Sequence, residues 1–354
     1  MPPAELTLPR ECTFDPADWQ IIARYWYPIA LAREVSEAPL GVKLLDQPLV
    51  VYRNDGQTVI ADDICPHRGV PLSLGQGDER GITCAYHGFR YGAGGRCVNI
   101  PAHPQAKIPS RLNLRTYPAV ERYGLIWTCL AAADAADAAS AAAAAEPEIP
   151  SHPHWDEAGF QQINCPWIDI AAFAGRQIEG FLDVAHFSFV HLKSFGNPEN
   201  PVVPDYKPVP TDDGFEVEYW SSVSNYGIGV EDPTEPGFEW LRHFRLHVPF
   251  TATLVVHFPN GGRLSIMNAA SPVSARMTRM FAPICRNFDT DQPVQGVYDF
   301  NRIVFEEDRA IVEVQKPENL PLDPKLEVHV PADRSSIAYR KALRGLGLGT
   351  FFTA

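Results

Sequence analysis

The chain has 354 residues, with 30 lysines and arginines against 43 aspartates and glutamates, for a formal net charge of −13. This length is enough for two domains with cores of their own, and the acidic balance, without any basic block, argues against nucleic-acid binding. No apolar run reaches the ~18 residues that a membrane helix needs, and no signal peptide opens the chain, so we expect a cytoplasmic protein without a membrane partner. The seven cysteines form an odd, scattered set, which predicts reduced thiols.

The first predicted domain covers residues 1–130 and includes an N-terminal extension over residues 1–20; short strands separated by turns dominate its residues 40–130. Asn54-Asp55-Gly56 lies between two such strands and is a hairpin signal. Residues 124–130 form a further apolar strand of the same kind. We therefore expect this part of the chain to form a small all-β domain.

Two loops of this predicted β domain carry mixed pairs of metal ligands, Cys65-Pro66-His67 and Cys84-Ala85-Tyr86-His87. A Rieske [2Fe–2S] cluster, in which two cysteines bind one iron and two histidines bind the other, needs this ligand set. A Cys2His2 zinc site has the same ligands, but there the cysteines usually pair with each other and the histidines with each other. The mixed pairs favour the iron–sulfur cluster and therefore one-electron transfer. The predicted ligands are Cys65, His67, Cys84 and His87.

The composition changes abruptly over residues 131–150, where a run of alanines is followed by a segment rich in proline and glutamate. Alanine favours helix, but this run has no apolar face distinct from a polar one. We therefore expect a surface linker that separates the first domain from a second domain over residues 151–354.

The second domain alternates strands with helices. Strands are expected between residues 214 and 267, with helices near residues 170–192 and 296–316 and a short last helix near residues 335–344. Strands bracketed by helices predict an α+β domain, in which a curved antiparallel sheet wraps against helices and leaves a cavity between them.

A second candidate metal site lies in the helix predicted near residues 170–192. His186 and His191 are five residues apart, so a regular helix would separate them by about 140° around its axis, too far to share one metal. The helix must therefore bulge or break there if both bind. Two imidazoles and one carboxylate form the ligand set of non-haem Fe(II) oxygenases. The carboxylate could come from Asp183 or from Asp308, which interrupts an apolar stripe on the later helix; hydrogen-bonded core histidines and an ordinary salt bridge are the structural alternatives.

The remaining histidines carry weaker signals. Those in proline-rich loops are expected to be solvated: His103, His152 and His154. Those on predicted strands are expected to face the core or the cavity rather than a metal: His243, His247 and His257.

Together these motifs resemble the Rieske non-haem iron oxygenases, and specifically their terminal oxygenase (alpha) component. The resemblance covers residues 20–345, and the segments 305–315 and 336–341 are similar to the compact branch of purine N-demethylases and of dicamba and vanillate O-demethylases. It implies an all-β Rieske domain followed by a helix-grip (START-like) catalytic domain. It also implies a homotrimer with one [2Fe–2S] cluster and one mononuclear Fe(II) per chain, the latter held by His186, His191 and Asp308.

Further roles follow from the same resemblance. Asp183 matches the aspartate that bridges the mononuclear site of one subunit and the cluster of its neighbour, where it would contact His87 across the interface and His186 on its own side. Asn268 lies where that branch places a polar substrate contact, although an ordinary strand-end hydrogen bond is the alternative. These roles make Asp183 a candidate catalytic residue and Asn268 a candidate substrate-binding residue.

The chain departs from the family pattern in two places. Gly180 stands where many members have asparagine, which puts in doubt any role of that amide near the iron. Val70 and Tyr86 stand where respiratory-chain Rieske proteins carry an extra disulfide-bonded cysteine on each loop. The second departure predicts an oxygenase-type cluster with a reduction potential near the low end of the Rieske range of roughly −150 to +300 mV.

The implied function is that of a terminal oxygenase, which uses O2 and reductase-delivered electrons to hydroxylate an aromatic or heteroaromatic substrate. The electrons come from NAD(P)H through a separate reductase or ferredoxin, because the chain has no nucleotide-binding glycine fingerprint. Monooxygenation such as O- or N-demethylation is the leading hypothesis, and cis-dihydroxylation of an aromatic ring is the alternative. A Rieske electron carrier without oxygenase activity, or a binding module that has lost its iron, would be a different class.

Overall fold

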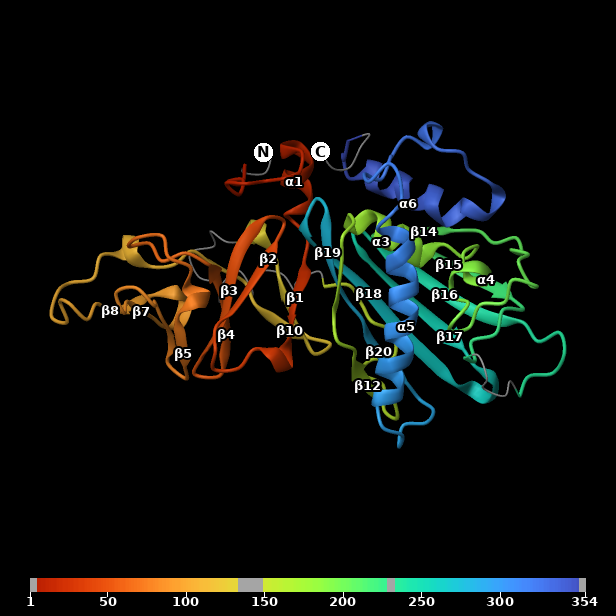
Figure 1. The fold of residues 1–354 in the computed structure, drawn as a ribbon, viewed down its shortest axis with the longest axis horizontal. Helices are drawn as coiled ribbons and strands as arrows, with labels where there is room; N and C mark the ends of the chain where they lie inside the picture. Colours follow the sequence, from red (N-terminus) through yellow and green to blue (C-terminus); the bar gives the residue numbers. More distant parts are fainter. Residues whose placement is uncertain (1–4, 133–148, 228–232, 350–354) are drawn as a thin grey trace. The chain divides into compact units, whose positions relative to one another are not determined.

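The computed structural model describes residues 5–132, 149–227 and 233–349, drawn in colour in Figure 1. The chain divides into two compact units, one formed by Met1–Cys12 and Trp19–Ile149 and the other by Thr13–Asp18 and Pro150–Ala354. The predicted linker lies almost wholly outside the described residues, so the domain boundaries at residues 130 and 150 stay predictions. No helix in the described ranges is long and apolar enough to cross a membrane.

The first unit is built from small antiparallel sheets. The Asn54–Gly56 hairpin turn is confirmed, because Asp55 and Gly56 both have positive φ (49° and 78°) between paired strands, as a two-residue turn of this type requires. The sheets are β1 (Tyr27–Leu31), β11 (Leu125–Thr128) and β10 (Val120–Arg122); β2 (Leu40–Leu44), β3 (Gln47–Asn54), β4 (Gln57–Asp62) and β9 (Thr116–Tyr117); and β5 (Gln76–Asp78), β6 (Gly81–Thr83), β7 (Arg90–Tyr91) and β8 (Cys97–Asn99).

The second unit is an α+β domain around a nine-stranded antiparallel sheet, in the order β12-β20-β18-β17-β16-β15-β14 with β13 and β19 joined beside β18. Figure 1 shows α5 lying across one face of this sheet. The strands are β12 (Gln161–Asn164), β13 (Ile168–Ile170), β14 (Val209–Thr211), β15 (Gly214–Ser221), β16 (Trp240–His247), β17 (Thr251–His257), β18 (Arg263–Ser274), β19 (Met277–Phe281) and β20 (Pro283–Arg286). The helices are α3 (Ala174–Leu182), α4 (Phe187–Val190), α5 (Gln295–Val312) and α6 (Arg334–Gly345), while α1 (Pro16–Ile22) spans a division between the units.

A buried ion-pair network fixes α3 against α6. Arg340 on α6 donates to both carboxylate oxygens of Glu179 on α3 (2.7 and 3.0 Å), and Arg176 donates to the same carboxylate (3.2 Å). Both arginines also reach the carboxylate of Glu327. Because each buried charge has an opposite charge and further hydrogen bonds, the network avoids the cost of isolated buried ions and holds the end of α3 in place.

Candidate metal centres and substrate cavity

The two cysteine–histidine loops have the same backbone hydrogen-bond pattern. Gly69 N–H donates to the Cys65 carbonyl (2.9 Å), and Gly88 N–H donates to the Cys84 carbonyl (3.1 Å). Each cysteine N–H in turn donates to the carbonyl five residues on, at 2.8 Å in both loops. Both glycines have positive φ (73° and 68°), a conformation that glycine adopts without steric cost. The loops are thus equivalent turns, each with a cysteine at its base.

The four predicted cluster ligands converge between these turns. The thiols of Cys65 and Cys84 are buried, at 3% exposure each, and the Tyr91 hydroxyl lies 3.1 Å from the Cys65 Sγ. The Nδ1 atoms of His67 and His87 face each other at 3.1 Å on the more exposed side. Two adjacent thiols and two adjacent imidazole nitrogens fit the donor set of a [2Fe–2S] cluster with one cysteine-bound and one histidine-bound iron.

The helix predicted near residues 170–192 is broken, not bulged. α3 ends at Leu182 because Asp183 has an extended conformation (φ −77°, ψ 129°), and the Asp183 side chain accepts a hydrogen bond from Ala185 N–H (2.8 Å). The chain then forms the single turn α4, with His186 and His191 at its two ends. This break removes the angular separation that a continuous helix would impose on the two histidines.

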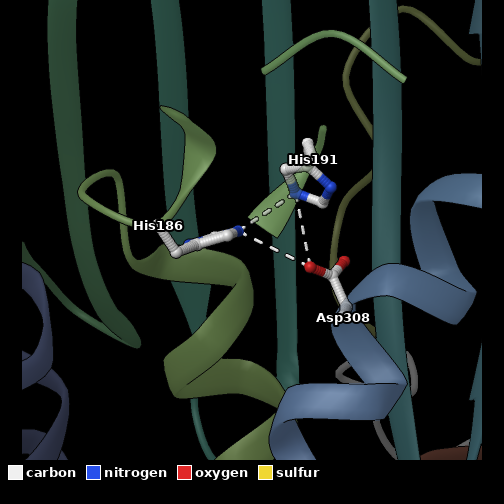
Figure 2. Close-up of side chains that lie close together, drawn as sticks. All are labelled: His186, His191 and Asp308. Atoms are coloured by element: carbon white, nitrogen blue, oxygen red, sulfur yellow. Dashed lines mark hydrogen bonds and ion pairs between the residues drawn. The ribbon is translucent and has the colours of Figure 1, made fainter. Parts of the chain in front are cut away.

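His186, His191 and Asp308 point toward one another, as Figure 2 shows. The two Nε2 atoms are 3.1 Å apart, and the Asp308 Oδ1 atom lies 3.5 Å from that of His186 and 3.3 Å from that of His191. All three donor atoms lie within 4.8 Å of one another. Two imidazole nitrogens and one carboxylate oxygen fit a non-haem Fe(II) site with open coordination positions, and the carboxylate comes from α5.

A carboxylate also faces the far nitrogen of each imidazole. Asp183 Oδ2 lies 3.5 Å from Nδ1 of His186, and Glu307 Oε2 lies 3.1 Å from Nδ1 of His191. Glu307 also accepts a hydrogen bond from the Ser194 hydroxyl (2.7 Å). Such outer carboxylates fix the orientation and tautomer of metal-binding histidines. Glu307 carries no signal in the sequence other than its place next to the candidate ligand Asp308, and it was not predicted as a site residue.

The electrostatics of the site favour a cation between the three side chains. Although burial lowers the pKa of His186, the carboxylates of Asp183 and Asp308 outweigh this effect and raise it to about 9. Burial lowers the pKa of His191, with Asp308 acting in the opposite direction. The negative potential that retains a proton on His186 would equally stabilise a metal ion in its place.

A cavity of about 660 Å³ borders His186, His191 and Asp308. Its walls are mostly aromatic and aliphatic, and they include the predicted Asn268. The Asn268 Nδ2 donates to the Met280 sulfur (3.1 Å), whereas its buried Oδ1 has no hydrogen-bond partner within the described ranges. The cavity therefore suits a flat apolar ring with few polar contacts.

Gly180 borders a small separate cavity of about 50 Å³ with Asp183 and His186. A Cβ atom at this position would meet only a methyl group of Val312, at an ordinary 3.5 Å. The position has room for a side chain, so close packing does not require glycine here.

His152 is buried at 6% exposure, so the prediction of a solvated side chain is wrong. Its ring packs on Trp155, with 5.1 Å between ring centres. Burial lowers the pKa of His152 to about 3, which keeps the imidazole neutral. The proline-rich composition predicted an exposed loop. Composition alone does not show which other elements pack against that loop.

Comparison with known proteins identifies the family. A Rieske [2Fe-2S] domain family matches residues 25–118, and the vanillate O-demethylase oxygenase C-terminal domain family matches residues 170–348. Methylxanthine N1-demethylase NdmA of Pseudomonas putida is 31% identical over 343 residues, which cover 92% of this chain and 90% of the relative. The chain belongs to the Rieske non-haem iron oxygenases.

Other members of this family support the same fold. The structure of Pseudomonas putida CBB5 NdmA with caffeine superposes with a TM-score of 0.78 at 29% identity, covering 92% of this chain and 91% of that one. The oxygenase component of dicamba O-demethylase from Stenotrophomonas maltophilia is 35% identical over 170 residues, 47% of this chain and 46% of the relative. As a Rieske oxygenase, the protein is an oxidoreductase that incorporates O2, carries a [2Fe–2S] cluster and a mononuclear iron, and takes electrons from a separate donor protein. The predictions of family, fold class, enzyme class and cofactors are confirmed.

Proposed function

We propose that this oxygenase removes a methyl group from an oxygen or nitrogen of an aromatic or heteroaromatic ring. Hydroxylation of the methyl carbon uses one oxygen atom of O2, and two electrons and two protons reduce the other atom to water. The unstable product then releases formaldehyde and leaves the demethylated ring. The observation that carries this proposal is the apolar cavity that borders His186, His191 and Asp308. Relatives named as N1-, N3- and O-demethylases support it.

The metal assignments belong to the same proposal. Cys65 and Cys84 would hold one iron of the cluster, and His67 and His87 the other. The mononuclear iron would be held by His186, His191 and Asp308. When bound, the cluster delivers single electrons, and the mononuclear iron activates O2.

The chain's own side chains would position the substrate and the ligands. The aromatic walls of the cavity exclude water and hold a flat ring. The unpartnered Oδ1 of Asn268 could accept a hydrogen bond from a substrate N–H or O–H group. Asp183 and Glu307 keep the two imidazoles in one tautomer and orientation.

Asp183 would also connect the two metal centres in a homotrimer. Its carboxylate is 31% exposed and lies on one side against His186, which leaves it able to accept a hydrogen bond from His87 of the partner subunit. Asp183→Asn should retain both metals and nearly abolish turnover, as iron analysis and O2 uptake would show. Asp299→Asn, an exposed carboxylate on α5, is the matched control. Unchanged turnover in Asp183→Asn would exclude this electron path.

The proposed reaction is tested by NADH and O2 uptake with a generic reductase against methoxylated and N-methylated aromatics. We expect substrate-dependent uptake with one formaldehyde released per O2 consumed. Dihydrodiol products without formaldehyde would instead establish ring dihydroxylation. Iron analysis should give about three irons per chain, against about two for an electron carrier with the cluster alone.

A further inference from the structure

A buried arginine in the cavity wall has no acidic partner in the described parts of the chain. Arg242 on β16 is 1% exposed and borders the cavity. Its guanidinium donates only to neutral groups: the Ser221 hydroxyl (2.9 Å), the Val223 carbonyl (2.7 Å) and the Asn225 Oδ1 (3.0 Å). Arg176 and Arg340 of the α3–α6 network, which are 4% and 2% exposed, have carboxylate partners instead.

Burial of a charge without an opposite charge costs free energy, so the burial of Arg242 needs an explanation. Burial lowers the pKa of Arg242 to about 10, which still leaves the guanidinium charged at neutral pH. Desolvation of such a group is offset only when an opposite charge or a full set of hydrogen bonds meets it. A guanidinium has five N–H donors, and three of them are used here.

Asn225 adds a further unused donor group next to the guanidinium. Its Oδ1 accepts from Arg242, while its Nδ2 is buried and has no hydrogen-bond partner among the residues that the structure describes. Both residues line the same cavity as the candidate iron ligands. The Arg242 guanidinium lies 5.4 Å from the ring centre of Phe187, and that ring is centred 4.9 Å from the imidazole of His186. One aromatic ring therefore separates this donor pair from the metal site.

We propose that Arg242 and Asn225 bind a carboxylate of the substrate, so that this oxygenase acts on methylated aromatic acids in preference to neutral rings. The inference rests on the proposed function and names its substrate class. A planar guanidinium matches the two oxygens of a carboxylate, and the Asn225 Nδ2 can donate to one of them. The bound carboxylate supplies the missing opposite charge and directs the far side of the ring toward the metal site.

Binding of matched acids and amides tests the charge preference. Calorimetry of the metal-loaded enzyme would compare 3- and 4-methoxybenzoate with 3- and 4-methoxybenzamide. We expect at least one acid to bind the wild-type protein at least about tenfold more tightly than its amide, and Arg242→Gln to remove this preference. Arg245→Gln is the control: Arg245 lies on the opposite face of the same strand, is 36% exposed and pairs with Asp213, so the preference should persist.

A second variant tests the same idea without removing the arginine. Asn225→Asp would place a carboxylate at the oxygen that accepts from Arg242, and this internal partner should also abolish the preference for acids. If Arg242 only supported the 221–225 segment, Arg242→Gln would weaken acid and amide binding equally, and the proposal would be overturned. It would also be overturned by equal wild-type affinities for every pair, or by a preference that depends on Arg286, the other arginine of the cavity wall.

The two proposals fail in different ways. Formaldehyde release from methylated rings without any preference for acids would leave the demethylase proposal standing and remove this one. Arg242-dependent binding of acids without formaldehyde from any compound would leave the carboxylate site standing and remove the demethylase proposal.

Discussion

The two loops proposed to hold the cluster and the proposed mononuclear site use similar side chains but are built differently. In the loops, each cysteine and its histidine lie on one short turn, held by backbone hydrogen bonds within the turn itself. At the proposed mononuclear site, two histidines lie at the ends of the short helix α4, and the carboxylate comes from α5, far along the chain. A local site depends on turn geometry, whereas a long-range site depends on packing between elements. The second should therefore be more easily disrupted from a distance.

The largest expected effect separates the two sites. Asp308→Ala removes the only one of the three ligands that α5 supplies, so iron content should fall from about three to about two per chain. Substrate-dependent O2 uptake should be lost, while the visible spectrum of the cluster is unchanged. Glu306→Ala, a neighbouring carboxylate that pairs with Arg309, is the control for iron content and activity. Retention of all the iron in Asp308→Ala would contradict the assignment.

A smaller effect on metal affinity and activity is expected from Glu307, whose carboxylate faces His191. Glu307→Gln keeps the side-chain size but removes the negative charge that faces Nδ1 of His191. Changes of this kind typically lower metal affinity or activity by about 10–100-fold, which Fe(II) titration and kcat would measure. The same substitution at Glu306 should have no such effect. Equal losses in both variants would show that Glu307 has no special role.

Unlike His186, whose pKa is raised by two carboxylates, His152 has a pKa that is lowered by burial. Its folded-state pKa of about 3 lies below the ordinary 6.5, so between these values only the unfolded chain takes up a proton. The stability contributed by neutral His152 is complete above pH 6.5 and is lost as the pH falls toward 3. Wild type should lose about 2 kcal/mol more than His152→Phe by pH 5.

Denaturant unfolding at several pH values measures this difference. His103→Phe, at an exposed loop position, should follow the wild-type pH dependence. Parallel curves for His152→Phe and wild type would contradict the burial argument.

The smallest expected effect concerns the cluster. Tyr91→Phe removes the hydroxyl that lies 3.1 Å from the Cys65 sulfur. Loss of one hydrogen bond to the sulfur disfavours the reduced cluster, so the potential should fall by roughly 20–60 mV. A redox titration measures the shift, with Tyr86→Phe on the exposed part of the loop as the control. Wild type itself should lie below about +100 mV on the Rieske scale.

Local spacing explains why the cluster loops could be predicted from the sequence. Each cysteine–histidine pair falls within one turn, and the glycine that allows the turn lies four residues after the cysteine, at Gly69 and at Gly88. The spacing of His186 and His191 showed only that a regular helix could not hold one metal between them. The choice between a bulge and a break depended on how Asp183 caps α3, which spacing alone does not determine.

The residues that the sequence did not reveal depend on tertiary contacts. Glu307 is buried because the turn after His191 packs on α5 and donates to it from Ser194. Arg242 occupies an alternating strand position where a polar residue would ordinarily face solvent, yet it faces the cavity. Neither contact leaves a pattern in the chain itself, because the partners come from other elements.

The α5 helix combines two tasks in one rigid element. Besides its metal-site carboxylate, it contributes a row of cavity-facing positions over several turns: Val297, Phe300, Asn301, Val304 and Phe305. Substitutions at these positions would change the shape of the cavity without displacing Asp308, because the backbone of the helix would stay in place. Substrate selectivity can therefore be changed by substitutions on one face of α5, without altering the side chain that binds the metal.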